Sequence, residues 1–350
     1  MDSQHYDSAP GRGCSGTLPG FDSEFTDIFD YILRITHRIW EGKQVGLCMD
    51  YYSVDCPVYT LAGCSQGAED VTQNTIRTLG SFPDRTLHAD NIICGGDADT
   101  GFHSSHLISS HMTNLGPSEF GPATGRSATI QVIAHCVCKD NRIVEEWLVR
   151  DNMSLARQLG VDPDTWARAR AAQPLDMDSQ FACWLDAEIR RVGSVERCRL
   201  PYPVDRSDGE ALIVAGLNNI WGARLVGDTH VMYSEESVLH ASARDDARGI
   251  AAIARFYMDL LSCLPDARVT VDYTCSDSMR DDGVFVAARW TLAGTHTGGT
   301  LWGAPTGVPI LVLGESHYRL VDGRVVEEWL VFDELAVLTQ IHRARRHGAG

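Results

Sequence analysis

The sequence predicts two α+β domains of similar size in tandem. The ten-residue segment RIVEEWLVRD at 142–151 recurs as RVVEEWLVFD at 324–333, an offset of 182 residues (324 minus 142). In each copy, apolar residues at helical spacing come first and strand-like patterns follow, an order typical of α+β domains. The pairs Asp140-Asn141 and Asp322-Gly323, which precede the two segments, suit a two-residue hairpin turn.

The repeat extends over most of the chain and sets the expected domain boundaries. Gly121 and Thr124 match Gly303 and Thr306 at the same offset, and further upstream Tyr52 meets Tyr233 at an offset of 181. Apolar residues between the copies have helical spacing. We expect a flexible N-terminal arm at 1–20, a first domain at 21–160, a helical linker at 161–204 and a second domain at 205–347.

Within the first copy, the elements follow from periodicity and from turn residues. Apolar residues from Phe25 to Ile39 recur at helical spacing and predict a long opening helix. A second helix is expected at 68–79, before Gly80 and the Pro83 turn. Strands are expected at 101–112, 128–138 and 142–151, and the last two form the hairpin.

Composition excludes several classes of function. The 350 residues include 47 acidic and 30 basic ones, a formal charge of −17, so the clustered cations of a nucleic-acid-binding surface are not expected. The sequence contains no run of about 18 apolar residues, so no membrane span is expected. The polar start of the chain lacks the apolar core of a secretory signal, so we expect a cytoplasmic protein whose 11 cysteines are reduced. No spacing of Cys and His residues predicts a metal site.

Several motifs together resemble a known family. They are Trp-Glu-Gly at 40–42, Tyr51-Tyr52, Phe-Pro-Asp-Arg at 82–85, Gly-x-Ala-Thr-Gly at 121–125 and the Glu-Glu-Trp strand. The chain resembles two tandem SnoaL-like polyketide cyclases of the NTF2-like superfamily. The resemblance implies a curved antiparallel sheet wrapped around helices, a cone with a pocket in its mouth. It also implies catalysis by an aspartate with polar neighbours such as histidine, without metal or organic cofactor, and Asp151 fits the family's terminal aspartate.

Strand alternation divides the repeated segment into two faces, provided that no bulge intervenes. One face carries Ile143, Glu145, Trp147, Val149 and Asp151, and the other carries Val144, Glu146, Leu148 and Arg150. Because the first set includes the large aromatic residue, we assign it to the interior, where desolvation raises the pKa of a carboxyl group. A two-residue turn also places His135 opposite Glu146, as a structural pair on the outer face.

The preceding strand differs between the copies. In copy two it presents an apolar face, formed by Val284, Val286, Ala288, Trp290 and Leu292. The corresponding residues of copy one are Phe102, Ser104, His106, Ile108 and Ser110, three of which are polar. Buried polar groups either satisfy one another or face a ligand. We therefore expect the active site in copy one, and the alternative is a neutral core histidine with a structural role.

These residues suggest a cofactor-independent acid/base enzyme. Asp151 is the expected general base, and His106 the acid or the donor to an oxyanion. Glu145 assists them, and the substrate is expected to contact Ser104, Ser110, Trp147, Tyr52 and Phe102. A weaker second pocket is expected at Glu327, Trp329, Asp333 and Tyr233. Cyclisation, isomerisation or elimination of a small carbonyl compound each begins with removal of a proton beside the activating group.

Two other readings of the same residues stay open. Epoxide or ester hydrolysis ranks lower, because the family's hydrolases usually place an arginine between the carboxylates and the predicted interior face has none. The other reading is a non-catalytic module that binds a small molecule or a partner. We also expect domain 1 to pair with domain 2 as an intramolecular pseudo-dimer, and a homo-oligomer is left open.

Overall fold

A computed structural model describes residues 18–196 and 201–347. The expected N-terminal arm lies outside the described residues except for its last part, Leu18–Gly20. The chain divides into two compact units. The first comprises the described residues up to Arg150 with Ser154–Val161 and Cys275–Asp281, and the second comprises Asp151–Met153, Asp162–Thr274 and the described residues from Asp282 onwards.

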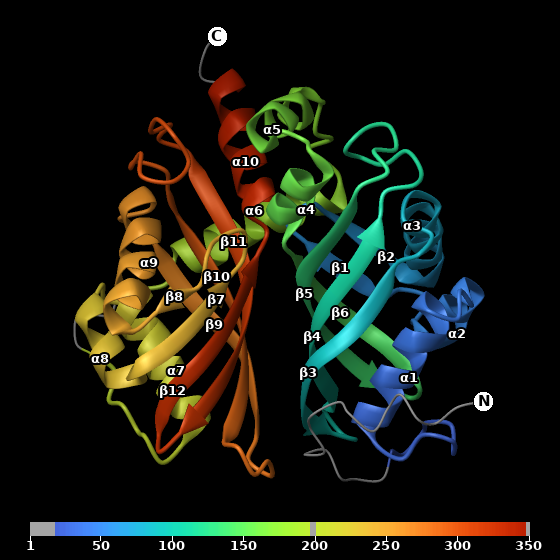
Figure 1. The fold of residues 1–350 in the computed structure, drawn as a ribbon, viewed down its shortest axis with the longest axis horizontal. Coiled ribbons are helices and arrows are strands. Elements are labelled where there is room, and N and C mark those ends of the chain that lie inside the picture. Colours follow the sequence, from blue (N-terminus) through green and yellow to red (C-terminus); the bar gives the residue numbers. More distant parts are fainter. Residues whose placement is uncertain (1–17, 197–200, 348–350) are drawn as a thin grey trace. The chain divides into compact units, whose positions relative to one another are not determined.

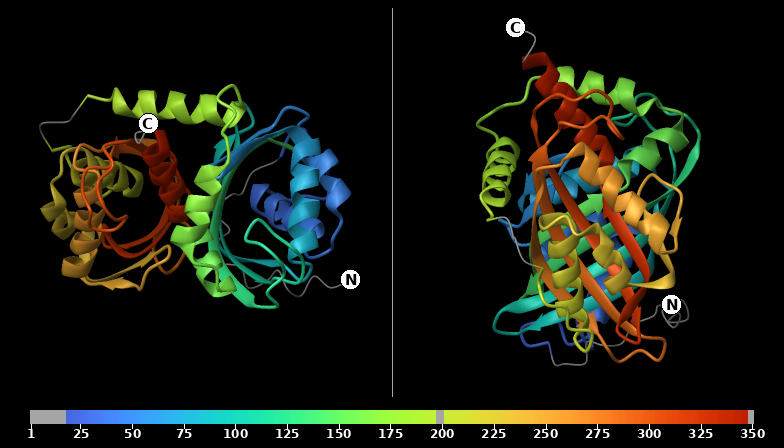
Figure 2. Two further views of the ribbon diagram at one scale, coloured as in Figure 1. Left: turned by 90° about the horizontal axis from the view of Figure 1, so that it is seen from above. Right: turned by 90° about the vertical axis from the view of Figure 1, so that its left-hand side faces the viewer.

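The first unit is built on a six-stranded mixed sheet with the strand order β2-β1-β6-β5-β4-β3 (Figure 1). Strand β1 runs parallel to β6, and all other neighbours are antiparallel. The sheet curves around its helices (Figure 2). The elements are α1 (Ile28–Trp40), α2 (Cys48–Tyr51), β1 (Pro57–Thr60), β2 (Gly63–Gln66), α3 (Gly67–Ser81), β3 (Thr86–Asp97), β4 (Gly101–Thr113), β5 (Ser127–Lys139) and β6 (Arg142–Arg150).

The second unit has the same order of strands, β8-β7-β12-β11-β10-β9, with β7 parallel to β12. Its sheet also curves around helices (Figure 2). Its elements are α7 (Gly209–Leu217), α8 (Thr229–Met232), β7 (Tyr233–Ala241), β8 (Ala247–Arg248), α9 (Ile250–Cys263), β9 (Arg268–Asp277), β10 (Val284–Thr295), β11 (Pro309–Val321), β12 (Arg324–Phe332) and α10 (Glu334–His347). Helix α4 (Asn152–Leu159) follows β6 as α10 follows β12, and two helices lie between the copies in sequence: α5 (Pro163–Ala172) and α6 (Gln180–Gly193). The predicted tandem α+β fold is confirmed.

Helix α1 forms because a capping residue precedes an amphipathic run. The side chain of Asp27 accepts a hydrogen bond from the backbone N–H of Asp30 (2.8 Å), which satisfies one free donor of the first turn. The buried face of α1, including Ile32 and Ile35, packs in one cluster with side chains of β3, β5 and β6. None of the described helices is long and apolar enough to cross a membrane.

The two hairpins have the predicted turns. Asp140 and Asn141 have φ angles of 49° and 64°, and Asp322 and Gly323 have φ angles of 52° and 67°. Two consecutive positive φ values define a type I′ turn, which Asn, Asp and Gly tolerate best. The turn residues therefore predicted the hairpins from sequence.

A β-bulge follows each turn and reverses the predicted faces of the repeated strand. Val137 pairs with Glu145, but Cys138 pairs with Ile143, so Val144 is an extra residue on β6. In copy two, Arg319 pairs with Glu327 and Leu320 with Val325, which leaves Val326 as the extra residue. One extra residue turns every later side chain to the opposite face. Our assignment of Glu145, Trp147 and Asp151 to the interior is therefore wrong, and Glu146, Leu148 and Arg150 face inward.

Candidate functional site

The inner face of β4 carries three buried polar side chains. Ser104, His106 and Ser110 are each at most 2% exposed. Ser110 has partners, because its Oγ accepts a hydrogen bond from Arg85 Nε (2.9 Å) and donates one to the Thr86 carbonyl (3.3 Å). Ser104 Oγ and His106 Nε2 are buried and have no hydrogen-bond partner among the described residues. An unpaired buried polar atom costs about 1–3 kcal/mol, so these two atoms are available to a ligand.

A neutral imidazole is the form that this environment favours. Burial lowers the pKa of His106 to about 3, because the charged imidazolium loses its hydration inside the domain. A neutral imidazole carries one N–H donor and one acceptor nitrogen. His106 can therefore donate a hydrogen bond to an oxygen on which negative charge develops.

Glu146 is the carboxyl group that faces this interior, and the sequence analysis had placed it outside. The hydroxyl of Tyr52 donates to Glu146 Oε2 (3.1 Å). Burial raises the pKa of Glu146 to about 7, while the Tyr52 hydrogen bond and the Arg150 charge act in the opposite direction. Such a group exchanges a proton readily near neutral pH. Tyr52, by contrast, was among the predicted residues.

Strand register places these groups around one area of the sheet. Ser104 and Glu146 both pair with Cys136 and flank it in one row across β4, β5 and β6. His106 and Leu148 flank Ala134 in the next row of the same face. With about 4.8 Å between neighbouring strands, the backbones of β4 and β6 are about 10 Å apart. Glu146 and His106 therefore face the same side of the sheet, on two strands that β5 separates.

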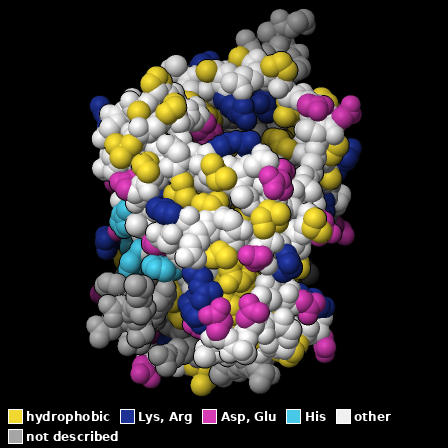
Figure 3. All heavy atoms as spheres, turned by 90° about the vertical axis from the view of Figure 1, so that its right-hand side faces the viewer, with side chains coloured by type: hydrophobic (Ala, Val, Ile, Leu, Met, Phe, Trp, Pro, Cys, Tyr) yellow, Lys and Arg dark blue, Asp and Glu magenta, His cyan; other side chains and the backbone are white. Residues whose placement is uncertain are grey.

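Two arginines that the sequence analysis did not select complete the polar interior. Arg85 is 6% exposed, and its guanidinium lies 4.8 Å from the ring centre of Trp40. Arg150 follows Glu146 and Leu148 on the inner face of β6, and its charge acts on both Arg85 and Glu146. Figure 3 views the molecule from the side of α1–α3 and shows a hollow with Lys or Arg side chains at its edge.

The remaining predicted residues of copy one lie elsewhere. Trp147 stacks on His135 (5.3 Å between ring centres) and on Tyr59 (5.8 Å), on the outer face. His135 pairs with Trp147 and not with Glu146, again because of the bulge. Asp151 belongs to the second unit, where its Oδ2 accepts the backbone N–H of Ala243 (2.9 Å). Phe102 packs against Phe21, with 5.8 Å between ring centres.

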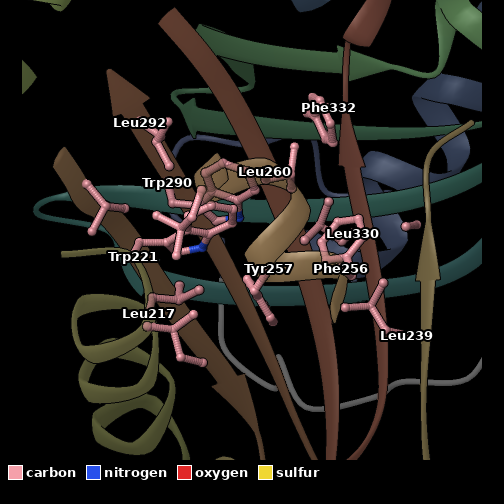
Figure 4. Packing of buried hydrophobic residues seen from close by; sticks show 14 of the residues in the cluster. Leu217, Trp221, Leu239, Phe256, Tyr257, Leu260, Trp290, Leu292, Leu330 and Phe332 are labelled. Carbon is pink, nitrogen blue, oxygen red and sulfur yellow. The ribbon is translucent and has the colours of Figure 1, made fainter. Parts of the chain in front are cut away.

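Copy two keeps the tyrosine and glutamate but not the other polar groups. Tyr233 and Tyr257 both donate to Glu328 Oε2, and burial raises the pKa of Glu328 to about 7. Trp221 and Trp290 stack at 6.3 Å between ring centres. Figure 4 shows both rings among leucines and aromatic residues of the same cluster. This interior is occupied by the protein's own side chains.

The prediction of a second pocket at Glu327, Trp329 and Asp333 is wrong, because these side chains have other partners. Glu327 Oε1 meets His240 Nε2 (3.1 Å), and Trp329 stacks on the His240 ring (5.5 Å). Asp333 Oδ1 accepts the N–H of Ala336 (3.0 Å) and so caps α10. The bulge at Val326 places Glu327 and Trp329 on the outer face. Of the predicted set, Tyr233 is the residue that points to the interior with Glu328.

Metal ligation has no candidate in the part of the chain that the structure describes. No three side chains among its His, Cys, Asp and Glu residues are grouped to hold a metal ion. Glu146 and His106 lie on the same face, but Tyr52 and burial account for the environment of the glutamate. The described side chains of the site, among them Glu146 and His106, can transfer protons and form hydrogen bonds.

The order of elements, helices followed by a curved mixed sheet, defines each unit as an NTF2-like α+β domain. The family model of SnoaL-like polyketide cyclases matches residues 31–159 and again residues 211–341. These segments cover more than half of the chain, and the protein therefore belongs to the SnoaL-like polyketide cyclase family, with two copies of the domain.

Solved structures to which parts of this chain are similar come from several bacteria. AclR, a putative hydroxylase from Streptomyces galilaeus, is 22% identical over 39% of this chain and 82% of its own, with a TM-score of 0.33. IdmH, a putative polyketide cyclase from Streptomyces antibioticus, is 23% identical over 39% of this chain and 98% of its own, with a TM-score of 0.32. TsrD from Streptomyces laurentii is 19% identical over 39% of this chain and 96% of its own, with a TM-score of 0.34. A comparison with curated proteins returned no match.

Proposed function

We propose that the first domain is a cofactor-independent acid/base enzyme that removes a proton beside the carbonyl group of a small organic substrate. The observation that carries the proposal is the buried Glu146, hydrogen-bonded to Tyr52 with a pKa raised to about 7, on the same inner face as His106, whose Nε2 has no partner among the described residues. A base of this pKa has both a deprotonated fraction and useful basicity at neutral pH. Family membership supports the same general chemistry.

The chemical step is the transfer of a proton from a substrate carbon to a carboxylate oxygen of Glu146. The substrate C–H bond breaks, its proton goes to a Glu146 carboxylate oxygen, and the electron pair moves onto the carbonyl oxygen as an enolate. His106 donates its N–H to that oxygen, since burial keeps the imidazole neutral. The enolate then attacks a second carbonyl, takes a proton at another carbon or expels a leaving group. These outcomes correspond to cyclisation, isomerisation and elimination.

Supporting roles fall to two of the predicted residues. Tyr52 holds the Glu146 carboxylate by its hydroxyl, which fixes the direction in which the other carboxylate oxygen points. Ser104 Oγ, buried and without a partner among the described residues, can accept or donate a hydrogen bond to a substrate oxygen. Asp151, the base predicted from sequence, is replaced in this proposal by Glu146, because the bulge turns Glu146 inward.

Deuterium exchange tests the proposal without knowledge of the natural substrate. Small ketones, among them 4-oxopentanoate, are incubated with the protein in D2O, and loss of the proton signals beside the carbonyl is followed by NMR. We expect exchange above the buffer rate with at least one ketone, and a decrease of about 10²–10⁴-fold in Glu146→Gln. Glu328→Gln is the matched control and keeps the wild-type rate. Wild-type exchange in Glu146→Gln, or no exchange with any ketone, contradicts the proposal.

Hydrolysis of an epoxide or ester is the second candidate, and one observation favours it. The interior face predicted from the sequence lacked an arginine, whereas Arg85 and Arg150 lie on the interior side of the sheet. Glu146 would then activate water. Turnover in water enriched in ¹⁸O distinguishes the two, because only hydrolysis places the label in the product.

Pairing of the two domains within one chain, assembly into a homo-oligomer and a cytoplasmic location remain proposals from the sequence. The presence of two copies in one chain supports the first. Sedimentation equilibrium measures the mass of the assembly against the 38.5 kDa of one chain. Fractionation of cells that produce the protein tests its location.

A further inference from the structure

The interior of domain 1 contains two arginines where the duplicate has apolar residues. At the repeat offset of 182, Arg85 corresponds to Ala267 and Arg150 corresponds to Phe332. Ala267 and Phe332 both belong to the hydrophobic core of the second unit. One domain therefore packs these two positions with hydrocarbon, and the other places a cationic group at each.

Arg85 is held in place but not neutralised. Its Nε donates to Ser110 Oγ (2.9 Å), and Trp40 covers one face of the guanidinium at 4.8 Å. It is 6% exposed and forms no ion pair with a described residue. A guanidinium that is buried without a carboxylate is unfavourable unless another group compensates its charge.

Arg150 adds a second cation nearby, whose charge acts on both Arg85 and Glu146. Its Nε is buried and has no hydrogen-bond partner among residues 18–196 and 201–347. Burial and, to a smaller extent, the charge of Arg150 lower the pKa of Arg85, and the nearby Glu41 carboxylate partly offsets them. One oxygen of Glu41 already accepts the backbone N–H of Leu87 (2.5 Å). The other oxygen, Glu41 Oε2, is buried without a hydrogen-bond partner among the described residues, and it forms no hydrogen bond with either arginine.

We propose that Arg85 and Arg150 form a binding site for an anionic oxygen group of the substrate, a carboxylate or a phosphate. Guanidinium groups bind both through paired N–H donors. This inference deepens the proposed function, on which it rests for the position of the reacting carbon near Glu146. The substrate class becomes a carbonyl compound that also carries an anionic group.

The spacing along β6 limits where that group can lie in the substrate. Arg150 follows Glu146 by four residues on the same face, which is about 13 Å between backbones at about 3.3 Å per residue. The arginine and glutamate side chains shorten this gap when they point toward one molecule. The anionic group therefore lies several bonds from the carbon that loses its proton.

Calorimetric titration of the full chain tests the site with three probes: 4-oxopentanoate, its neutral methyl ester and inorganic phosphate. We expect 4-oxopentanoate to bind at least 10-fold more tightly than the ester. Arg150→Gln and Arg85→Gln each weaken its binding at least 10-fold, and Arg85→Lys weakens it less. Arg77→Gln, an exposed arginine on α3, is the control and binds as the wild type does. Phosphate that competes with 4-oxopentanoate identifies a phosphate-bearing substrate, and phosphate that does not compete identifies a carboxylate.

Equal binding of the acid and the ester, or wild-type binding in Arg150→Gln, overturns the proposal. If Arg85→Gln does not fold, the proposal is tested by the affinities of 4-oxopentanoate and its methyl ester and by binding to Arg150→Gln. Failure of this site and failure of the proposed function are separable. Binding that depends on Arg150 while exchange is independent of Glu146 rejects the proposed function alone. Exchange that depends on Glu146 while the acid and the ester bind equally rejects the anion site alone.

Discussion

The two domains share a fold and a buried Tyr–Glu pair, but their interiors differ. Tyr52 with Glu146 corresponds to Tyr233 with Glu328, and both glutamates have pKa values raised to about 7 by burial. Around this pair, domain 1 places Arg85, Ser104, His106, Ser110 and Arg150, and domain 2 places Ala267, Val286, Ala288, Leu292 and Phe332. Burial alone is therefore not a sign of catalysis. The polar side chains at these positions, where domain 2 has apolar ones, distinguish the candidate active domain from its duplicate.

Packing in domain 2 gives the largest expected effect on stability. Trp290→Ala removes a fully buried indole that stacks on Trp221, so we expect a loss of about 3–5 kcal/mol in the free energy of unfolding. His106→Ala installs in domain 1 the residue that domain 2 has at Ala288 and costs less than about 1 kcal/mol, because the imidazole Nε2 lacks a partner. Denaturant unfolding measures both. Similar losses would mean that both interiors are packed cores.

The two glutamates should behave alike in stability, which sharpens the contrast in function. The folded protein keeps the Glu146 proton up to about pH 7, whereas the ordinary pKa of a glutamate is 4.5. Stability from this group is therefore complete below pH 4.5 and is lost as the pH rises through 7, by about 3 kcal/mol. Glu146→Gln should remove the loss of stability that comes from Glu146, and Glu328→Gln should remove the similar loss that comes from Glu328. The free energy of unfolding, measured from pH 5 to pH 8, tests this prediction. If both variants show the same pH dependence of stability as the wild type, the two carboxyl groups are not buried as described.

The histidine of domain 1 gives the opposite pH dependence. The folded-state pKa of His106 lies at about 3, below the ordinary histidine value of 6.5. Its contribution is present above pH 6.5 and is lost as the pH falls, by up to about 1.4 kcal/mol per pH unit. In NMR the His106 ring signals should not titrate between pH 5 and 8. Titration near 6.5 would place His106 in contact with solvent and remove the contrast with Ala288.

The smallest effect is expected at the carboxylate next to the proposed base. Glu145 lies on the outer face because of the bulge at Val144, so Glu145→Gln should change ketone exchange less than twofold and stability by less than about 0.5 kcal/mol. The exchange assay used for Glu146→Gln measures it. A loss as large as that in Glu146→Gln would restore the face assignment made from the sequence.

Much of the fold could be read from local pattern. The repeat at 142–151 and 324–333 indicated the duplication, and the turn pairs at 140–141 and 322–323 indicated the hairpins, because positive φ angles select for Asn, Asp and Gly. Strands β1, β2 and β3 were not predicted. They carry mixed polar and apolar residues, and β3 has its own register shift between Ala89 and Asn91.

The sequence by itself determined that the chain has two α+β copies and that Ser104, His106 and Ser110 replace an apolar face. Equivalent positions of the two copies can be compared from the sequence alone, without the tertiary structure. The tertiary structure decided which carboxylate faces inward and which cations surround it. A bulge of one residue reverses the faces of a strand without a clear sequence signal, and Arg85 reaches the interior from the turn after α3. The proposed base is therefore Glu146 and not Asp151, because side-chain direction depends on strand pairing that lies far away in the sequence.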